Sequence, residues 1–149
     1  MEEGDCCRMK ILIINICKEK LHYVRNSSKF GISDHPKVQR KINTGLLYYE
    51  FVKPVEDVLN GLGVNYFVKH YKNLKKEDLG EAEKIIICGT SLKDNEFVKN
   101  AKRFLWLKDY DGKVLGICGG MQVIGLIFGG KLKKKTEVGF YREKFDEDF

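Results

Sequence analysis

Residues 113–130 (KVLGICGGMQVIGLIFGG) place one cysteine where an apolar strand should turn into a helix. Val114–Ile117 is a short apolar run, and Met121–Phe128 has the composition of an apolar helix that two glycines end. A strand that enters a helix through a glycine-rich corner is the geometry of a nucleophile elbow, which holds the corner residue in a strained backbone conformation. Cys118 is therefore a candidate nucleophile. The simplest alternative is a buried structural cysteine in a β–α turn.

Small residues surround this cysteine at Gly116, Gly119 and Gly120. They let the strand and the helix approach closely, and they leave backbone N–H groups available to a reacting oxyanion. The amino end of the helix also favours a thiolate over a thiol at Cys118.

The segment G-I-C-G-G-M-Q, residues 116–122, resembles the class I glutamine amidotransferase signature G-x-C-x-G-x-Q. The resemblance implies that Cys118 attacks the side-chain amide of glutamine and that the Gly119 N–H is one oxyanion donor. It also implies that Gln122 and Gly116 help to hold the bound glutamine.

A second passage fits the same family. Lys84–Cys88 reads as a buried strand, and Gly89-Thr90-Ser91 follows it. The family has a Gly-Gly-Pro-like turn here, whose backbone N–H is the second oxyanion donor. The resemblance therefore assigns that donor to Gly89 and Thr90, although the side chains differ from the family pattern. The alternative is a simple β–α turn in which Ser91 or Asp94 caps the next helix.

The remaining elements must position these residues. Continuous apolar runs predict buried parallel strands, and apolar residues at helical spacing predict helices between them. Pro54 should begin the regular helix within 46–62, with a separate helical piece before it. We expect His70 to be a surface residue. The predicted elements are strands at Met9–Cys17, Val64–His70, Lys84–Cys88 and 113–117, a helix or turn at Lys76–Glu83, an amphipathic helix at Asn95–Lys108, and one or two strands at Lys131–Phe140.

The alternation of strands and helices predicts an α/β fold, a three-layer α/β/α sandwich with a mostly parallel, flavodoxin-like sheet. Ligands of such sheets bind at the carboxyl ends of the strands, where Cys17, Gly89-Thr90 and Cys118 should meet. We expect a polar leader at residues 1–8 and a single amidotransferase-like domain at 9–149. Residues 18–44 are polar and form a predicted loop insertion or lid.

A cysteine nucleophile requires a base, and the base requires an orienting group. The resembled family supplies a histidine and a glutamate from a later G-x-Q-F-H-P-E passage, which has no counterpart after Cys118. The sequence therefore predicts a C-terminally shortened domain. Three explanations stay open: another segment or chain supplies the pair, the protein only binds a ligand, or His22 or His35 acts as the base.

The resemblance implies a glutaminase that delivers ammonia to a partner synthetase or transferase subunit. One alternative is a peptidase or stress protein of the related cysteine-elbow superfamily, which pairs the cysteine with an early glutamate, here Glu19. The other is a non-catalytic binding or assembly module. An incomplete sheet would favour self-association or a partner.

Composition narrows these choices. Hydrophobic residues make up 43% of the 149 residues and charged residues 32%, as in an ordinary globular protein. The net charge of +6 is spread along the chain, so we expect no nucleic-acid partner. Apolar runs are too short for a membrane span. Five cysteines without scaffold density indicate a reducing cytoplasm, and we expect no metal and no cofactor. Abundant Lys, Glu and Ile with two glutamines suggest a thermophilic source.

Overall fold

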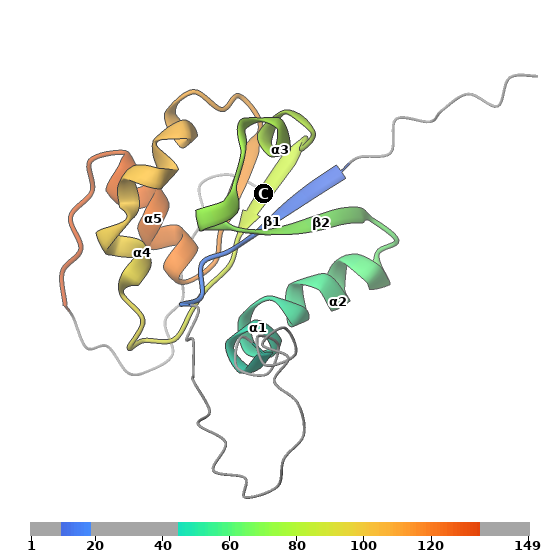
Figure 1. The fold of residues 1–149 in the computed structure, drawn as a ribbon, viewed down its shortest axis with the longest axis horizontal. Coiled ribbons are helices and arrows are strands. Elements are labelled where there is room, and N and C mark those ends of the chain that lie inside the picture. The colour runs from blue at the N-terminus through green and yellow to red at the C-terminus, as the bar shows by residue number, and fades with distance from the viewer. Residues whose placement is uncertain (1–9, 19–44, 135–149) are drawn as a thin grey trace, which may run out of the picture.

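The computed structural model describes residues 10–18 and 45–134 of the chain (Figure 1). Strands and helices alternate through these ranges, with two short 3-10 helices among them. In chain order the elements are β1 (Lys10–Asn15), α1 (Gly45–Phe51), α2 (Lys53–Gly61), β2 (Asn65–His70), η2 (Tyr71–Asn73), α3 (Lys76–Gly80), β3 (Lys84–Ile87), α4 (Glu96–Lys99), η3 (Ala101–Lys108), β4 (Lys113–Gly116) and α5 (Gly119–Ile127).

The four described strands form one parallel sheet in the order β2-β1-β3-β4. Strand β1 pairs with β2 on one side and with β3 on the other, and Ile13 is aligned with both Val68 and Ile86. A strand covered on both faces needs apolar side chains in consecutive positions, and Ile11 to Ile14 are all buried. The sheet confirms the predicted α/β fold, with β1 at its centre and β2 at an edge.

Helices cover both faces of the sheet, which gives the three layers (Figure 1). Successive strand residues point to opposite faces. Leu12 and Ile14 pack with Phe104 and Val123 under α4, η3 and α5. Ile11 and Ile13 pack under α1 and α2, in a cluster with Val52 and Leu59. Burial of each such side chain contributes about 1.5–3 kcal/mol of transfer free energy, so the central strand β1 is held from both sides.

The helical region before β2 is divided as the sequence predicted. Helix α1 ends at Phe51, and α2 begins at Lys53 with Pro54 in its first turn. The missing N–H of a proline costs nothing at that position, because the first helical N–H groups have no partner inside the helix. Val52, between the two helices, is fully buried against the sheet.

The prediction of one amphipathic helix over Asn95–Lys108 was wrong. Helix α4 ends at Lys99, and the chain continues as the 3-10 helix η3. The Asn100 side-chain Nδ2 donates to the Glu96 carbonyl oxygen at 2.9 Å, and the Asn100 backbone N–H donates to the same oxygen at 3.1 Å. An asparagine that competes in this way for a backbone carbonyl disfavours continuation of the α-helix.

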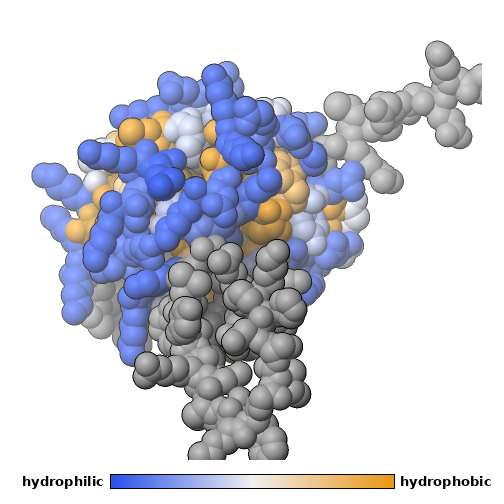
Figure 2. Space-filling model, in the orientation of Figure 1, coloured by the Kyte–Doolittle hydropathy of each residue, from blue (hydrophilic) through white to orange (hydrophobic). Residues whose placement is uncertain are grey.

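Lys131–Lys134, the described part of the predicted strand region Lys131–Phe140, forms no strand, and the rest of that prediction lies outside the described residues. No helix within residues 10–18 and 45–134 is long and apolar enough to cross a membrane. The face shown in Figure 2 is largely hydrophilic, with apolar residues in small separate patches.

Candidate active site

Three cysteines lie at the carboxyl edge of the sheet. Cys17 follows β1, Cys88 follows β3 and Cys118 follows β4, and parallel strands end on the same side. Cys17 and Cys88 are buried, whereas Cys118 is exposed. This edge is where ligands bind in open parallel sheets. Of the three described thiols, only that of Cys118 is therefore presented to a substrate.

Burial also affects the acidity of the two enclosed thiols. Burial raises the pKa of Cys88 to about 12, with a smaller contribution from the neighbouring Cys17. Burial is also the main cause that raises the pKa of Cys17, against a smaller opposing effect of the Thr90 side chain. Both groups are thiols at neutral pH, and a thiol is a weak nucleophile.

The backbone at Cys118 has the strained conformation expected of an elbow. Its φ of 52° and ψ of −106° make it the one non-glycine residue with positive φ within the described ranges. The Ile117 N–H donates to the Ile87 carbonyl oxygen at 2.9 Å, so β4 stays paired with β3 up to the corner. Such a conformation costs of order 1–3 kcal/mol and persists only where surrounding contacts enforce it.

The glycines beside the corner are required by close backbone packing. A Cβ on Gly120 would lie 2.1 Å from the Ile87 carbonyl oxygen, and a Cβ on Gly116 would lie 2.6 Å from the Gly120 carbonyl carbon. Neither backbone can move aside as a side chain could. Gly116, predicted to help bind glutamine, thus packs against the first turn of α5 and is not among the residues that line the pocket beside Cys118.

A small pocket of about 60 Å³ lies beside the corner. Its wall includes Thr90, Asp94, Phe97, Cys118, Gly119 and Gln122. A site for one water needs about 10–15 Å³ on this measure, so the pocket has room for a few such positions. That is enough for a terminal carboxamide group but not for a whole amino acid. A much larger cavity, about 1000 Å³ and lined by Trp106 and Tyr110 among others, lies elsewhere and includes none of these residues.

Two backbone segments border the cysteine within this pocket. The absent Cβ of Gly89 would lie 3.1 Å from the Cys118 Cβ, so the turn after β3 passes directly beside the nucleophile candidate. Thr90 follows and is 4% exposed. Gly119 is the first residue of α5, and the first N–H groups of a helix have no acceptor within it. Gly119 and Thr90, the predicted oxyanion donors, therefore both line the pocket beside Cys118.

Asp94 is a buried carboxylate in the same pocket. The sequence suggested it only as a helix cap. Its Oδ2 accepts hydrogen bonds from Thr90 Oγ1 at 2.7 Å and from the Lys18 backbone N–H at 2.6 Å. Its Oδ1 accepts from the Glu96 N–H at 3.1 Å, at the start of α4. The capping interpretation was thus correct in part. The contact to Lys18, 76 positions away, could not be read from local sequence.

His70, expected at the surface, is only partly exposed. His70 is half-buried at the end of β2, its Nε2 lies 2.9 Å from the Cys17 carbonyl oxygen, and its Nδ1 accepts from the Lys72 N–H. Backbone groups hold both ring nitrogens of His70 at the edge strand β2. The ring is therefore not placed to deprotonate Cys118. The other base candidates His22 and His35, and Glu19 of the peptidase alternative, lie outside the described residues.

Across residues 10–18 and 45–134, no side chain is hydrogen-bonded to the Cys118 sulfur. Over the same ranges, no group of three or more His, Cys, Asp or Glu side chains is arranged to hold a metal ion. The described site therefore has a nucleophile candidate, the two residues predicted as backbone donors, and a small pocket.

Comparison with known proteins adds one finding. The family model described as glutamine amidotransferase class-I matches residues 47–145, about two thirds of the chain, including β2, β3, the Thr90 turn and the Cys118 corner. Neither the curated proteins nor the solved structures gave a match.

Proposed function

Because this chain belongs to the class I glutamine amidotransferase family, we propose that it hydrolyses the side-chain amide of glutamine through Cys118. The observation that carries the proposal is the corner itself. Cys118 is exposed on a strained turn, and it lines a small pocket together with Gly119 and Thr90.

The proposed reaction begins with attack of the Cys118 sulfur on the δ-carbon of glutamine. The carbonyl oxygen becomes an oxyanion, which the N–H groups of Gly119 and Thr90 stabilise. The C–N bond then breaks, and the nitrogen leaves as ammonia with the proton that the thiol gave up. Water hydrolyses the resulting thioester, so glutamine and water yield glutamate and ammonia. Gln122, one helical turn after the corner, is proposed to contact the bound glutamine.

None of the described side chains is hydrogen-bonded to the Cys118 sulfur, so none of them is placed to accept the proton of the thiol. We propose that this base comes from outside residues 10–18 and 45–134, either from another part of the chain or from a partner. In the amidotransferase family the ammonia goes to a synthetase or transferase, and we propose such a partner for this chain.

One observation favours a second candidate, a non-catalytic binding module on the same fold. His70 is the one histidine within the described ranges, and both of its ring nitrogens are hydrogen-bonded to backbone groups at the end of β2. If no base is recruited, the same pocket would bind a carboxamide without hydrolysing it.

Ammonia release from glutamine distinguishes the two candidates. We expect purified full-length protein to release ammonia in a glutamate dehydrogenase-coupled assay, and the Cys118→Ala variant to release none. Cys118→Ala is also expected to retain glutamine binding in calorimetry, because the pocket walls remain. Glutamine binding without ammonia release by the wild-type protein, both alone and with its partner synthetase or transferase present, would support the binding module and overturn the glutaminase proposal.

A further inference from the structure

We propose that Asp94 is a positioning residue that holds the Thr90 turn against Cys118 and so fixes the second oxyanion donor. This inference rests on the proposed function for its catalytic meaning, and on hydrogen bonds of the described residues for its geometry. Asp94 touches neither the nucleophile nor the reacting amide in this account, and it acts through Thr90.

The turn after β3 needs an external restraint. It runs from Gly89 to Asn95 without regular secondary structure, and the one backbone hydrogen bond inside it joins the Asp94 N–H to the Ser91 carbonyl oxygen at 2.9 Å. A backbone N–H stabilises an oxyanion well only when it is already aimed at the place where the charge develops. A turn with one internal bond would not hold the Thr90 N–H in that way.

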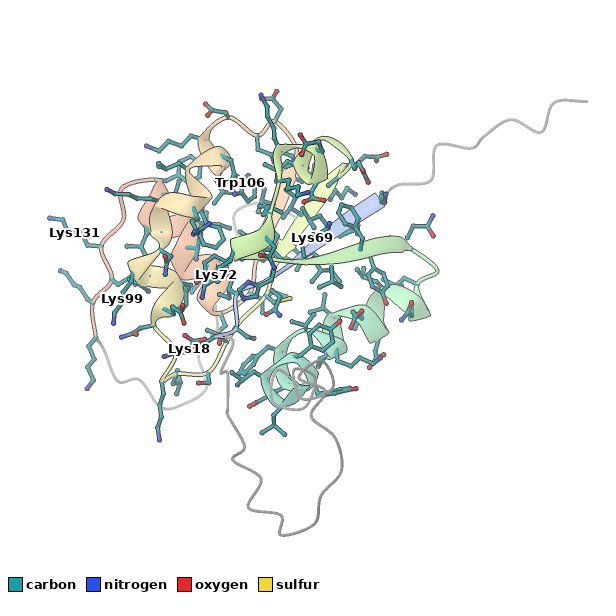
Figure 3. All side chains as sticks on the ribbon, viewed as in Figure 1. Lys18, Lys69, Lys72, Lys99, Trp106 and Lys131 are labelled. Atoms are coloured by element: carbon teal, nitrogen blue, oxygen red, sulfur yellow. The ribbon has the colours of Figure 1, made fainter. Side chains whose placement is uncertain are left out.

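Asp94 supplies the restraint at three points. Its carboxylate joins the Thr90 hydroxyl, the Lys18 N–H after β1, and the Glu96 N–H at the first residue of α4. Hydrogen bonds to a charged acceptor are stronger than those between neutral groups. The carboxylate is 8% exposed, so water competes weakly for these donors. Lys18 lies beside the turn that precedes α4 in Figure 3.

The contact with Lys18 extends the network to the centre of the sheet. Strand β1 pairs with β3 as far as the alignment of Ile14 with Ile87, and the Cys88 N–H donates to the Ile14 carbonyl oxygen at 3.0 Å. Asp94 therefore links the turn to the segment that follows β1 and to the first residue of α4. A group that is restrained from several sides by hydrogen bonds is held close to one geometry.

The test uses two reagents that react with the same sulfur. Glutamate γ-semialdehyde, an aldehyde analogue of glutamine, forms a tetrahedral thiohemiacetal whose oxygen needs the oxyanion donors. Iodoacetamide alkylates the sulfur by displacement of iodide and needs none. The dissociation constant of the semialdehyde is measured by its protection of Cys118 from iodoacetamide, with the labelled peptide quantified by mass spectrometry.

We expect Asp94→Asn and Thr90→Val to raise the dissociation constant of the semialdehyde by about 10- to 100-fold. An effect of this size is expected when an oxyanion donor is still present but misplaced. Alkylation without semialdehyde should proceed at the wild-type rate. Thr90→Val keeps the backbone N–H and removes only the hydroxyl that Asp94 holds. In the double variant the two effects should not add, because they break one contact.

Asp78→Asn is the matched control. Asp78 is also 8% exposed and also accepts a backbone N–H, but it lies at α3, away from the pocket. We expect it to change neither reaction of Cys118. Unchanged protection in both Asp94→Asn and Thr90→Val, beside a protected wild type, would overturn the role of Asp94.

Hydrogen exchange separates this inference from the proposed function. In Asp94→Asn the amides of Lys18 and Glu96, which donate to Asp94, should exchange faster than in the wild type, with the amides of β1 and β3 unchanged. If the semialdehyde does not protect the wild-type protein, the glutaminase proposal is contradicted, and the exchange measurement still tests the restraint by Asp94. Equal exchange of the two amides in both proteins would overturn that restraint.

Discussion

Cys118 combines an exposed thiol with a backbone conformation that few side chains adopt. The strain is sustained by close packing around it, where Gly116 and Gly120 let β3, β4 and α5 approach to backbone contact. The sequence predicted this corner because glycine spacing reports directly on such contacts. It did not predict the hydrogen bond of Asp94 to the Lys18 N–H, because Lys18 lies 76 positions away and local patterns carry no information about contacts at that separation.

The two glycines of α5 offer a matched test of the packing. A Cβ at position 120 would meet the Ile87 carbonyl oxygen at 2.1 Å, whereas a Cβ at position 125 would meet nothing within 4 Å. We expect Gly120→Ala to lower the free energy of unfolding by at least roughly 2 kcal/mol through overpacking. Gly125→Ala should raise it by about 0.5–1 kcal/mol, because alanine loses less entropy in a helix.

Urea denaturation followed by circular dichroism measures both changes. The expected result is a lower midpoint for Gly120→Ala and a higher one for Gly125→Ala, with the same slope. Equal midpoints for the two variants would show that α5 is not packed on β3 as described.

At the scale of elements, most helices and strands were predictable where one residue decides the local conformation. Pro54 set the start of α2, and continuous apolar runs marked β1 and β3. Helix α5 begins two residues before its predicted start, because Gly119 and Gly120 are poor helix formers in isolation and are helical only through packing. The break at Asn100 depends on a side-chain hydrogen bond that hydrophobic spacing does not show.

Helix α3 provides a prediction at this scale. Asp78 Oδ2 accepts the Lys75 N–H at 2.9 Å, and Oδ1 lies 3.0 Å from Lys69 Nζ. The Lys75 hydrogen bond is the main cause that lowers the pKa of Asp78, and Lys69 contributes less. We expect Asp78→Ala to lose about 1 kcal/mol of unfolding free energy at pH 7, the usual value of a helix cap.

The pH dependence follows from the direction of that pKa shift. A carboxylate with a lowered folded pKa contributes stability that is fully present above its unfolded pKa, near 3.9. That stability is lost as the pH falls through the lower folded value. The gap between wild type and Asp78→Ala, measured by urea denaturation, should therefore narrow below about pH 4. A gap of the same size at pH 3 and pH 7 would contradict this account.

Asp57→Ala is the control for that measurement. Asp57 pairs with Lys53 on the exposed face of α2, and its side chain is 60% exposed. Exposed pairs contribute about 0–1 kcal/mol, so the variant should differ little from the wild type at either pH.

For the whole molecule, fold class and strand positions followed from the sequence, because buried parallel strands need apolar residues on both faces. The identity of the base that should activate Cys118 could not be predicted from the sequence. A triad assembles from side chains far apart in the chain, and the family passage that would reveal it has no match here. The described residues bring together the candidate nucleophile Cys118, the two residues predicted as backbone donors, and a small pocket.

We propose above all that Cys118 is a nucleophile in a pocket that recognises glutamine. The intact mass of the full-length protein, measured after incubation with a γ-diazoketone analogue of glutamine and beside Cys118→Ala, tests this proposal. We expect one adduct, formed with loss of dinitrogen, slowed by excess glutamine and absent from the variant. An adduct that persists in Cys118→Ala, or a wild-type protein that iodoacetamide alkylates at Cys118 but the diazoketone does not, would contradict it.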